Sequence, residues 1–437
     1  MELAIAFIVF IASMIATIVL DLSMVWALLV GLGAFLSVGK IRGFGFSEQM
    51  KMGLESLKDS KGVVQIMLII GLITATWRVS GTITVFVYYG IRIISPPIFL
   101  LVAYLLACVL SYALGTSYGV AGTVGVIFMA LARSGDVDPV IAAGVILSGV
   151  YFGDRCSPAS SCANLVAGVT GTDIFSNVKM MIRTAGIPFA LTLAAYTILS
   201  IKNPISHVDE TLVAAFEEQF NLSFWAFIPA IFMLVLPFLK VKVKYAMLTS
   251  IASGILVAWL VQGVELPSVL HTCIFGYRAD GEGLGAILNG GGLVSMIEVS
   301  IILAISSLYS GIFSDTNMLG ELQDMLGRAC TKLGKFSVMI MMSIAMVAIF
   351  CNQTIAILMC NDLMKRPYFD CGADKEELAM DMANSVVLIS GLIPWSIACN
   401  VPLTFMGADP SSVPYALYLY IVPVVYWFTK KRWFKTR

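Results

Sequence analysis

The sequence predicts an all-α polytopic membrane protein made of two inverted-topology repeats, whose broken helices or re-entrant hairpins meet near the membrane midplane. Three observations lead to this prediction: the composition, the spacing of apolar stretches, and a motif that recurs at a constant offset. Apolar residues make up 59% of the 437 residues and charged residues only 12%, and the mean hydropathy is +0.92. A soluble chain carries about 25% charged residues, so the composition excludes an ordinary soluble protein.

The apolar stretches are long and frequent enough for many membrane spans. A helix needs about 20 apolar residues to cross a bilayer. We expect a first series at 3–20, 22–39, 63–81, 97–114, 117–132, 139–152 and 184–201. We expect a second series at 223–239, 245–262, 290–312, 336–351, 353–364, 378–393 and 411–429. Segments 44–61 and 316–335 mix apolar and charged residues at helical spacing, which predicts amphipathic helices at the membrane interface.

Basic residues set the orientation of a membrane protein, because they stay in the cytoplasm. They cluster after the second stretch (Lys40 to Lys61), before the seventh (Lys179, Arg183), in one short turn (Lys240 to Lys244) and at the C-terminal end (Lys430 to Arg437). All of them can be cytoplasmic if the chain starts there. Both termini are then cytoplasmic and the acidic connector, residues 205–218, is external. The segments 1–204 and 219–437 become two repeats of opposite topology.

The two halves also share a motif. The pattern P-x-S-x3-N-x6-G-x-D begins at Pro158 and again at Pro394, an offset of 394 − 158 = 236. The same offset aligns Thr116 with Asn352 and Ser117 with Gln353. Inverted repeats are common in secondary transporters, which bind their substrates near the midplane where the repeats meet.

Two segments are too polar and too rich in glycine and proline for plain spans: Ser148 to Asp173 and Ser390 to Asp409. Proline breaks a helix, and irregular backbone at membrane depth occurs only where it lines protein or a watery cavity. Ion or substrate ligands are therefore expected among the polar side chains of these segments: Ser157, Ser160, Ser161, Asn164, Ser396 and Asn400. Secondary candidates open the adjoining helices: Thr116, Ser117, Tyr118, Asn352, Gln353 and Thr354. The alternative is that all these groups only form hydrogen bonds between helices.

Carboxylates inside membrane spans are costly and often functional. Asp154 is the first candidate because it lies at the break, where partial desolvation favours uptake of a proton. Its alternative role is a structural ion pair with Arg155 or another basic residue. Glu298 and Asp381 lie in other apolar runs and are either functional or structural charges. The only two histidines lie in expected loops, so no metal site or histidine relay is predicted.

Residues SGVYFGDRCSPASSCANLVAG resemble the signature of the NhaC-type sodium/proton antiporter family, close to GD(K/R)-x-SP-x-SDTTNLA. The segments GYRADGEGLGAILNGGGLVSMIEV and GLIPWS resemble the same family. The resemblance implies a carrier of a prokaryotic inner membrane driven by Na+ or H+ gradients, with two inverted repeats. Some relatives exchange organic anions or amino acids. Coordination of Na+ is then expected at Asp154, Asn164 and Asn400.

The sequence departs from this signature at positions that matter for proton transfer. Ser161 replaces an acidic residue, Cys162 and Ala163 replace threonines, and Ala383 and Asn384 occupy positions where relatives often carry two acids. The proton must then reside on Asp154, Glu298 or Asp381, or the substrate is organic.

The leading hypothesis is therefore a cation-coupled secondary transporter, with Na+/H+ antiport by alternating access favoured. A Na+- or H+-coupled transporter of an amino acid or carboxylate is the alternative. No metalloprotease, intramembrane-protease or P-loop motif is found, so enzymatic activity and ATP drive are not expected. The 27 basic and 27 acidic residues cancel, which gives no sign of a nucleic-acid partner. We expect lipid and a small ion or solute as partners and no cofactor beyond the coupling ions. The sequence leaves a homodimer open.

Overall fold

Helices make up most of the described residues in the computed structural model, as the sequence predicts. The structure describes residues 2–434 apart from 21, 94–95, 205–209, 240, 280–283, 286–287, 299, 303, 306–307, 309–311 and 313–319. Part of the connector, part of the span expected at 290–312, the start of segment 316–335, and Lys240, Lys435 and Arg437 therefore lie outside the described residues. Within these limits, the only β-type pairing is an isolated bridge between Tyr277 and Gly290.

The first half contains these helices: α1 Glu2–Val19, α2 Met24–Ile41, α3 Phe46–Val79, α4 Thr82–Ile93, α5 Phe99–Leu114, α6 Ser117–Val120, α7 Val126–Ser134, α8 Pro139–Cys156, α9 Ser161–Thr170 and α10 Ile174–Lys202. A π-helical turn, η2 Ala121–Gly125, joins α6 to α7. The connector carries α11 Glu210–Gln219. The second half contains α12 Ile228–Phe238, α13 Val243–Leu260, α14 Leu266–Phe275, α17 Gly320–Leu333, α18 Lys335–Phe350, α19 Gln353–Asp370, α20 Lys375–Ala383, α21 Val386–Ile389, α22 Ile397–Phe405, the 3-10 segment η5 Pro410–Tyr415 and α23 Leu417–Trp433.

Among the described residues, three helical runs are long and apolar enough to cross a membrane: Ser117–Ser134, Pro139–Thr170 and Ile174–Lys202. The bent pair Leu68–Val79 and Thr82–Tyr89, which turns by 63°, would make a fourth. Several further expected spans correspond to shorter apolar helices of 10–17 residues, including α5, α18 and most of α2 and α13. Many of the predicted spans are thus interrupted or short.

The amphipathic helix expected at 44–61 does not exist as a separate element. It forms the first part of α3, which continues without interruption from Phe46 to Val79. No proline occurs in this stretch, so no residue removes a backbone donor and ends the helix. The other expected amphipathic segment contains α17, which is helical as predicted.

Helix boundaries repeat at the offset found in the sequence. Helices α5 and α18 begin at 99 and 335 and end at 114 and 350, and both differences equal 236. The run from α6 to α7 covers 117–134, and α19 covers 353–370, again 236 apart. Helices α9 and α22 begin at 161 and 397. The alignment thus extends far beyond the sixteen-residue motif.

The left-handed backbone positions follow the same alignment. A positive φ is uncommon outside glycine, and among the described residues only Asp136 (57°) and Cys351 (55°) show it without being glycine. Their partners at the offset of 236 are glycines with positive φ, Gly372 (74°) and Gly115 (65°). The two halves therefore turn in the same way where their sequences differ.

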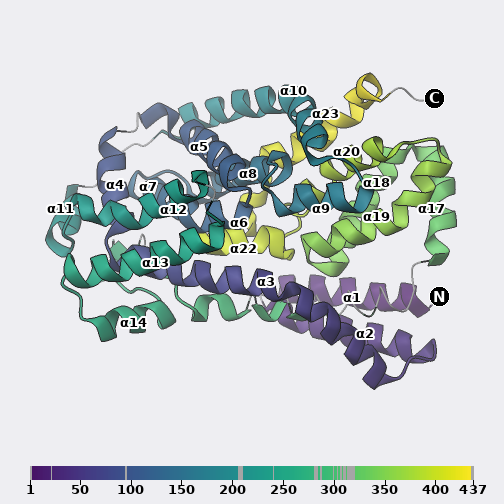
Figure 1. Cartoon of the computed structure of the whole chain (residues 1–437), viewed down its shortest axis with the longest axis horizontal. Coiled ribbons are helices and arrows are strands. Elements are labelled where there is room, and N and C mark those ends of the chain that lie inside the picture. Colours follow the sequence, from purple (N-terminus) through teal and green to yellow (C-terminus); the bar gives the residue numbers. More distant parts are fainter. Residues whose placement is uncertain are drawn as a thin grey trace.

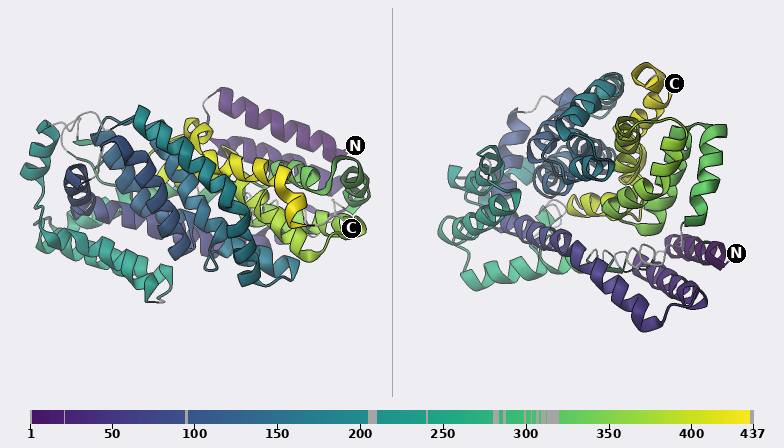
Figure 2. Two further views of the ribbon diagram at one scale, coloured as in Figure 1. Left: turned by 90° about the horizontal axis from the view of Figure 1, so that it is seen from above. Right: turned by 45° about the vertical axis from the view of Figure 1, so that its right-hand side comes forward.

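The molecule is elongated, and its termini lie together at one end of the long axis (Figures 1 and 2). Helix α11 lies at the opposite end. Helix α5 lies on the α11 side of the centre, and α18 lies on the side of the termini (Figure 1).

Both predicted breaks are present. Helix α8 ends at Cys156 and the chain turns before α9 begins at Ser161. In the second half the helix already breaks at Asn384 and Ser385, earlier than the expected Ser390, and turns separate α21 from α22. Two interrupted helices thus lie in the bundle at equivalent positions.

Glycines allow α8 to approach α5 closely. A Cβ atom at Gly153 would lie 2.0 Å from the carbonyl carbon of Ser111, and one at Gly149 would lie 2.5 Å from the Cβ of Ala107. Small residues four apart are the usual means by which membrane helices pack backbone to backbone. This contact fixes the end of α8 that carries Asp154.

Candidate functional site

A cavity of about 90 Å³ lies where the breaks of the two halves meet. The first half contributes Thr116, Ser117, Tyr118, Asp154, Ser161 and Cys162, and the second contributes Asn352, Gln353, Thr354 and Ile397. The pairs Thr116 with Asn352 and Ser117 with Gln353, aligned by the sequence offset, thus face one space. The structure therefore brings together candidates that are more than 200 residues apart.

The N-terminal ends of four helical segments lie at the cavity. Its lining includes the first residue of each: Ser117 of α6, Ser161 of α9, Gln353 of α19 and Ile397 of α22. Side chains cap all four ends. The Thr116 hydroxyl accepts from Gly119 N (3.3 Å), and the side-chain oxygen Oδ1 of Asn352 accepts from Thr354 N (2.9 Å). Ser160 and Ser396 cap α9 and α22. Helix N-termini carry partial positive charge, which stabilises a negative group in the cavity.

Asp154 provides that negative group. It is buried, with 3% of its surface exposed. The side-chain amide of Gln353 donates to one carboxylate oxygen at 3.2 Å, and the Ser160 hydroxyl lies 3.2 Å from the other. Ser160 also donates to the backbone carbonyl of Asp154 at 2.5 Å. A carboxylate of the first half is therefore held in part by an amide of the second.

The alternative role for Asp154, an ion pair with Arg155, is wrong. No ion pair of Asp154 occurs within the described part of the chain. Successive helical residues point about 100° apart, so Arg155 faces a different environment. Its guanidinium donates to Asn384 Oδ1 (2.5 Å), Thr184 Oγ1 (3.0 Å) and the Met181 carbonyl (3.2 Å). Asn384, predicted to stand where relatives carry an acid, is thus the principal partner of a fully buried arginine.

The remaining polar residues of the breaks are not among those that line the cavity. Ser157 donates to the carbonyl of Tyr112 at 2.6 Å, and Ser396 only caps α22. The amide of Asn164 donates to the carbonyls of Pro158 (2.8 Å) and Ser160 (2.7 Å). Asn400 accepts from the Thr404 hydroxyl at 3.1 Å. Asn164 and Asn400 are therefore not part of this cavity's lining, because each lies about one turn into its helix, beyond the residues that open it.

Two predicted carboxylates also lie elsewhere. Glu298 is exposed and accepts from the Ser23 hydroxyl at 2.5 Å. Asp381 is fully buried, but it accepts from Tyr368 (2.7 Å) and Tyr426 (2.9 Å) and forms an ion pair with Lys430. Neither belongs to the cavity lining. Both occur in apolar runs, and the periodicity of the sequence gives no sign of which neighbours they meet.

The sequence analysis missed Ile397, and it identified Cys162 only as a departure from a signature. Both follow the serines that cap their helices, Ser160 and Ser396, so the aligned caps were the signal that could have found them. Together the lining offers hydroxyl, amide and carboxylate oxygens, the ligand types that hard cations prefer. Such a site can bind a small cation, a proton, or the polar end of a small solute.

Comparison with known proteins identifies the family of this chain. The chain matches the Na+/H+ antiporter family over residues 149–429. It is 25% identical to the malate-2H(+)/Na(+)-lactate antiporter of Bacillus subtilis over 90% of this chain and 86% of that protein. It is 25% identical to the Na(+)/H(+) antiporter NhaC of Alkalihalophilus pseudofirmus, covering 88% and 85%. It is also 25% identical to the arginine/ornithine antiporter ArcD of Halobacterium salinarum, covering 80% and 73%. The chain therefore belongs to the Na+/H+ antiporter family, a family of membrane-embedded secondary transporters.

Proposed function

We propose that this protein exchanges Na+ for H+ across a prokaryotic inner membrane, with both ions competing for Asp154. The observation that carries the proposal is a buried carboxylate with amide and hydroxyl partners, at the cavity where the two halves meet. A buried charge without a counter-ion is costly. Binding either Na+ or a proton removes that cost, so each ion excludes the other.

The other lining oxygens complete a sodium site in this proposal. Side chains of Ser117, Asn352 and Ser161 lie around the same cavity and add ligands without adding charge. A volume of about 90 Å³ suits an ion that keeps one or two waters, given about 30 Å³ for each water. Asn164 and Asn400 are left out of this ligand set because neither residue lines the cavity.

Alternating access requires two halves that can move about the site, and we propose that these are inverted repeats, 1–204 and 219–437, joined by the connector 205–218. The constant offset of the helix boundaries supports this. The path of the chain supports it too. Helix α5 lies on the α11 side of the centre and α18 on the side of the termini (Figure 1), and each ends two residues before a lining residue, Thr116 and Asn352. In this arrangement both termini are cytoplasmic and α11 is external.

A second candidate, coupled transport of an amino acid or carboxylate, is favoured by one feature of the cavity. Four helix N-termini can hold a carboxylate group, as they do in other transporters, while Asp154 can hold a cation. Small neutral side chains, Ser161 and Cys162, replace the bulkier pattern of the signature at the cavity wall. Relatives described as malate/lactate and arginine/ornithine antiporters show that the family includes such activities.

Reconstitution into proteoliposomes separates the two candidates. With an internal pH dye, an imposed Na+ gradient should move protons in the opposite direction, and choline in place of Na+ should not. Because protons and Na+ compete, the Na+ concentration for half-maximal exchange should rise as the pH falls. Absence of Na+-driven proton movement, together with Na+-dependent uptake of a carboxylate or amino acid, would show that the second candidate is correct.

A further inference from the structure

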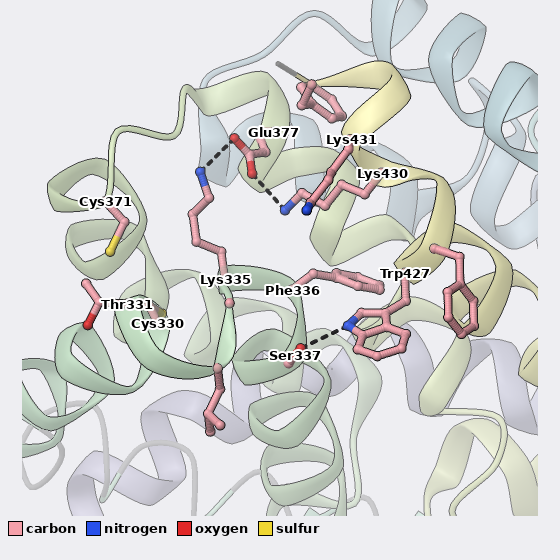
Figure 3. Close-up of a pocket in the computed structure, with 14 residues that line it drawn as sticks. Cys330, Thr331, Lys335, Phe336, Ser337, Cys371, Glu377, Trp427, Lys430 and Lys431 are labelled. Atoms are coloured by element: carbon pink, nitrogen blue, oxygen red, sulfur yellow. Dashed lines mark hydrogen bonds and ion pairs between the residues drawn. The ribbon is translucent and has the colours of Figure 1, made fainter. Parts of the chain in front are cut away.

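A second cavity lies away from Asp154, near the C-terminal end of the chain. It has a volume of about 720 Å³ and is open to the outside. Its walls come from the end of α17, the first turn of α18, and the last turns of α23 (Figure 3). The proposed exchange of ions does not use this cavity.

The cavity has a net positive lining. Lys335 and Lys430 flank Glu377, at 3.0 and 2.7 Å from its two carboxylate oxygens (Figure 3). Lys430 also forms an ion pair with Asp381. Lys431 lines the same cavity, is exposed, and has no carboxylate partner within the described chain. Three lysines thus face two carboxylates, so one positive charge remains for a ligand.

Backbone donors add to this charge. The first turn of α18, residues 334–337, forms part of the wall. The residue at its N-cap position, Gly334, offers no side chain to the amides of that turn. Uncapped amides at a helix N-terminus favour an anion. They supplement the lysines, which carry the argument.

The opposite side of the cavity is apolar and continues onto the outer face of α23. Trp427 and Phe428 line the cavity and are 51% and 72% exposed. Val424 and Tyr420, one and two turns earlier on the same face, are also exposed. In a membrane helix such a face contacts acyl chains, with Trp near the headgroups. A lipid tail can therefore lie along α23 while its headgroup enters the cavity.

We propose that this cavity binds an acidic phospholipid, with its phosphate near Lys431 and its acyl chains against Trp427 and Phe428. Charge complementarity and continuity with the apolar face of α23 favour a lipid over a soluble anion. Basic pockets between membrane helices recognise anionic headgroups in this way. The bound lipid would join α18 to α23 beside the Glu377 ion pairs.

The test uses the full-length protein purified in detergent. Native mass spectrometry and thermal unfolding are measured with added phosphatidylglycerol, phosphatidylcholine or inorganic phosphate. We expect phosphatidylglycerol to be retained and to raise the unfolding temperature more than phosphatidylcholine does.

Lys431→Gln should weaken the binding of phosphatidylglycerol about five-fold, the effect of one juxtamembrane charge. Lys179→Gln, at an exposed lysine at the start of α10, is the matched control and should bind like the wild type. Lys335 and Lys430 are not substituted, because both hold Glu377.

Equal retention of the two lipids would overturn the proposal, and so would equal weakening by Lys431→Gln and Lys179→Gln. Stabilisation by inorganic phosphate alone, matching that by phosphatidylglycerol, would assign the cavity to a soluble anion and also overturn it. The contact between the acyl chains and Phe428 is tested with Phe428→Ser. This change should weaken binding of phosphatidylglycerol without changing any effect of free phosphate.

Discussion

Two carboxylates, Asp154 and Asp381, are buried to nearly the same extent in this bundle and have opposite surroundings. Asp381 meets a lysine and two tyrosine hydroxyls, and Lys430 also binds Glu377. Asp154 lies at a cavity and has an amide and a hydroxyl as its hydrogen-bond partners. The comparison separates a charge neutralised by the protein from one that an ion must neutralise.

The difference follows from the position of each carboxylate in its helix. Asp381 lies inside α20 and packs against α19 and α23, which supply its partners. Asp154 lies at the end of α8, where the chain breaks and helix N-termini replace side-chain cations. Burial alone therefore does not identify a transport carboxylate. The identity of its neighbours does.

The largest effect is expected from Asp154→Asn. An amide cannot titrate or carry the charge that holds Na+, so Na+-driven pH changes in proteoliposomes should disappear. The protein should still fold, because Gln353 and Ser160 can bond to an amide. Asp370→Asn, at an exposed residue of α19, is the matched control and should exchange ions at the wild-type rate. Wild-type exchange by Asp154→Asn would remove this residue from the mechanism.

The opposite outcome is expected for Asp381→Asn, which should affect stability more than transport chemistry. Breaking a buried ion pair outright costs about 3–5 kcal/mol, and the cost here should be smaller because Lys430 keeps its ion pair with Glu377. The unfolding temperature in detergent should fall clearly, and Asp381→Asn combined with Lys430→Met should recover part of the loss. If the single variant keeps its stability and loses exchange, the contrast between the two carboxylates fails.

The sequence predicts the fold class and much of the site because both depend on local signals. Proline and glycine mark the breaks, and the offset of 236 aligns Thr116 with Asn352, two residues that line one cavity. Asp381 and Glu298 could not be separated from Asp154 in this way. Their roles depend on Lys430 and Ser23, which are distant in sequence and carry no pattern that links them. The early break at Asn384 was missed for a similar reason, since the fully buried Arg155 that binds it lies 229 residues away.

A smaller effect is expected from Gln353→Leu, which removes the hydrogen bond that the second half makes to Asp154. Loss of one hydrogen bond to a charged group should weaken apparent Na+ affinity about ten-fold, with a smaller change in the maximal rate. Gln323→Leu removes an amide that bonds the carbonyl of Asp362 and is the control. Equal Na+ affinities in the two variants would indicate that Gln353 has only a packing role.

The smallest effect, and the finest test of the comparison, is expected from Ser161→Asp. This change places a second acid at the start of α9, on the wall of the Asp154 cavity, at the position where the family signature carries one. Two carboxylates at one site repel each other when both are ionised, so a proton is held more firmly. The pH profile of Na+-driven exchange should therefore move toward alkaline pH while exchange persists. Ser161→Asn has nearly the same size without the charge and should leave the profile in place. An unchanged profile in both variants would mean that Ser161 does not share a site with the transported ions. If the second candidate function holds instead, Ser161→Asp should reduce uptake of a carboxylate substrate more than Ser161→Asn does, because the new charge repels it.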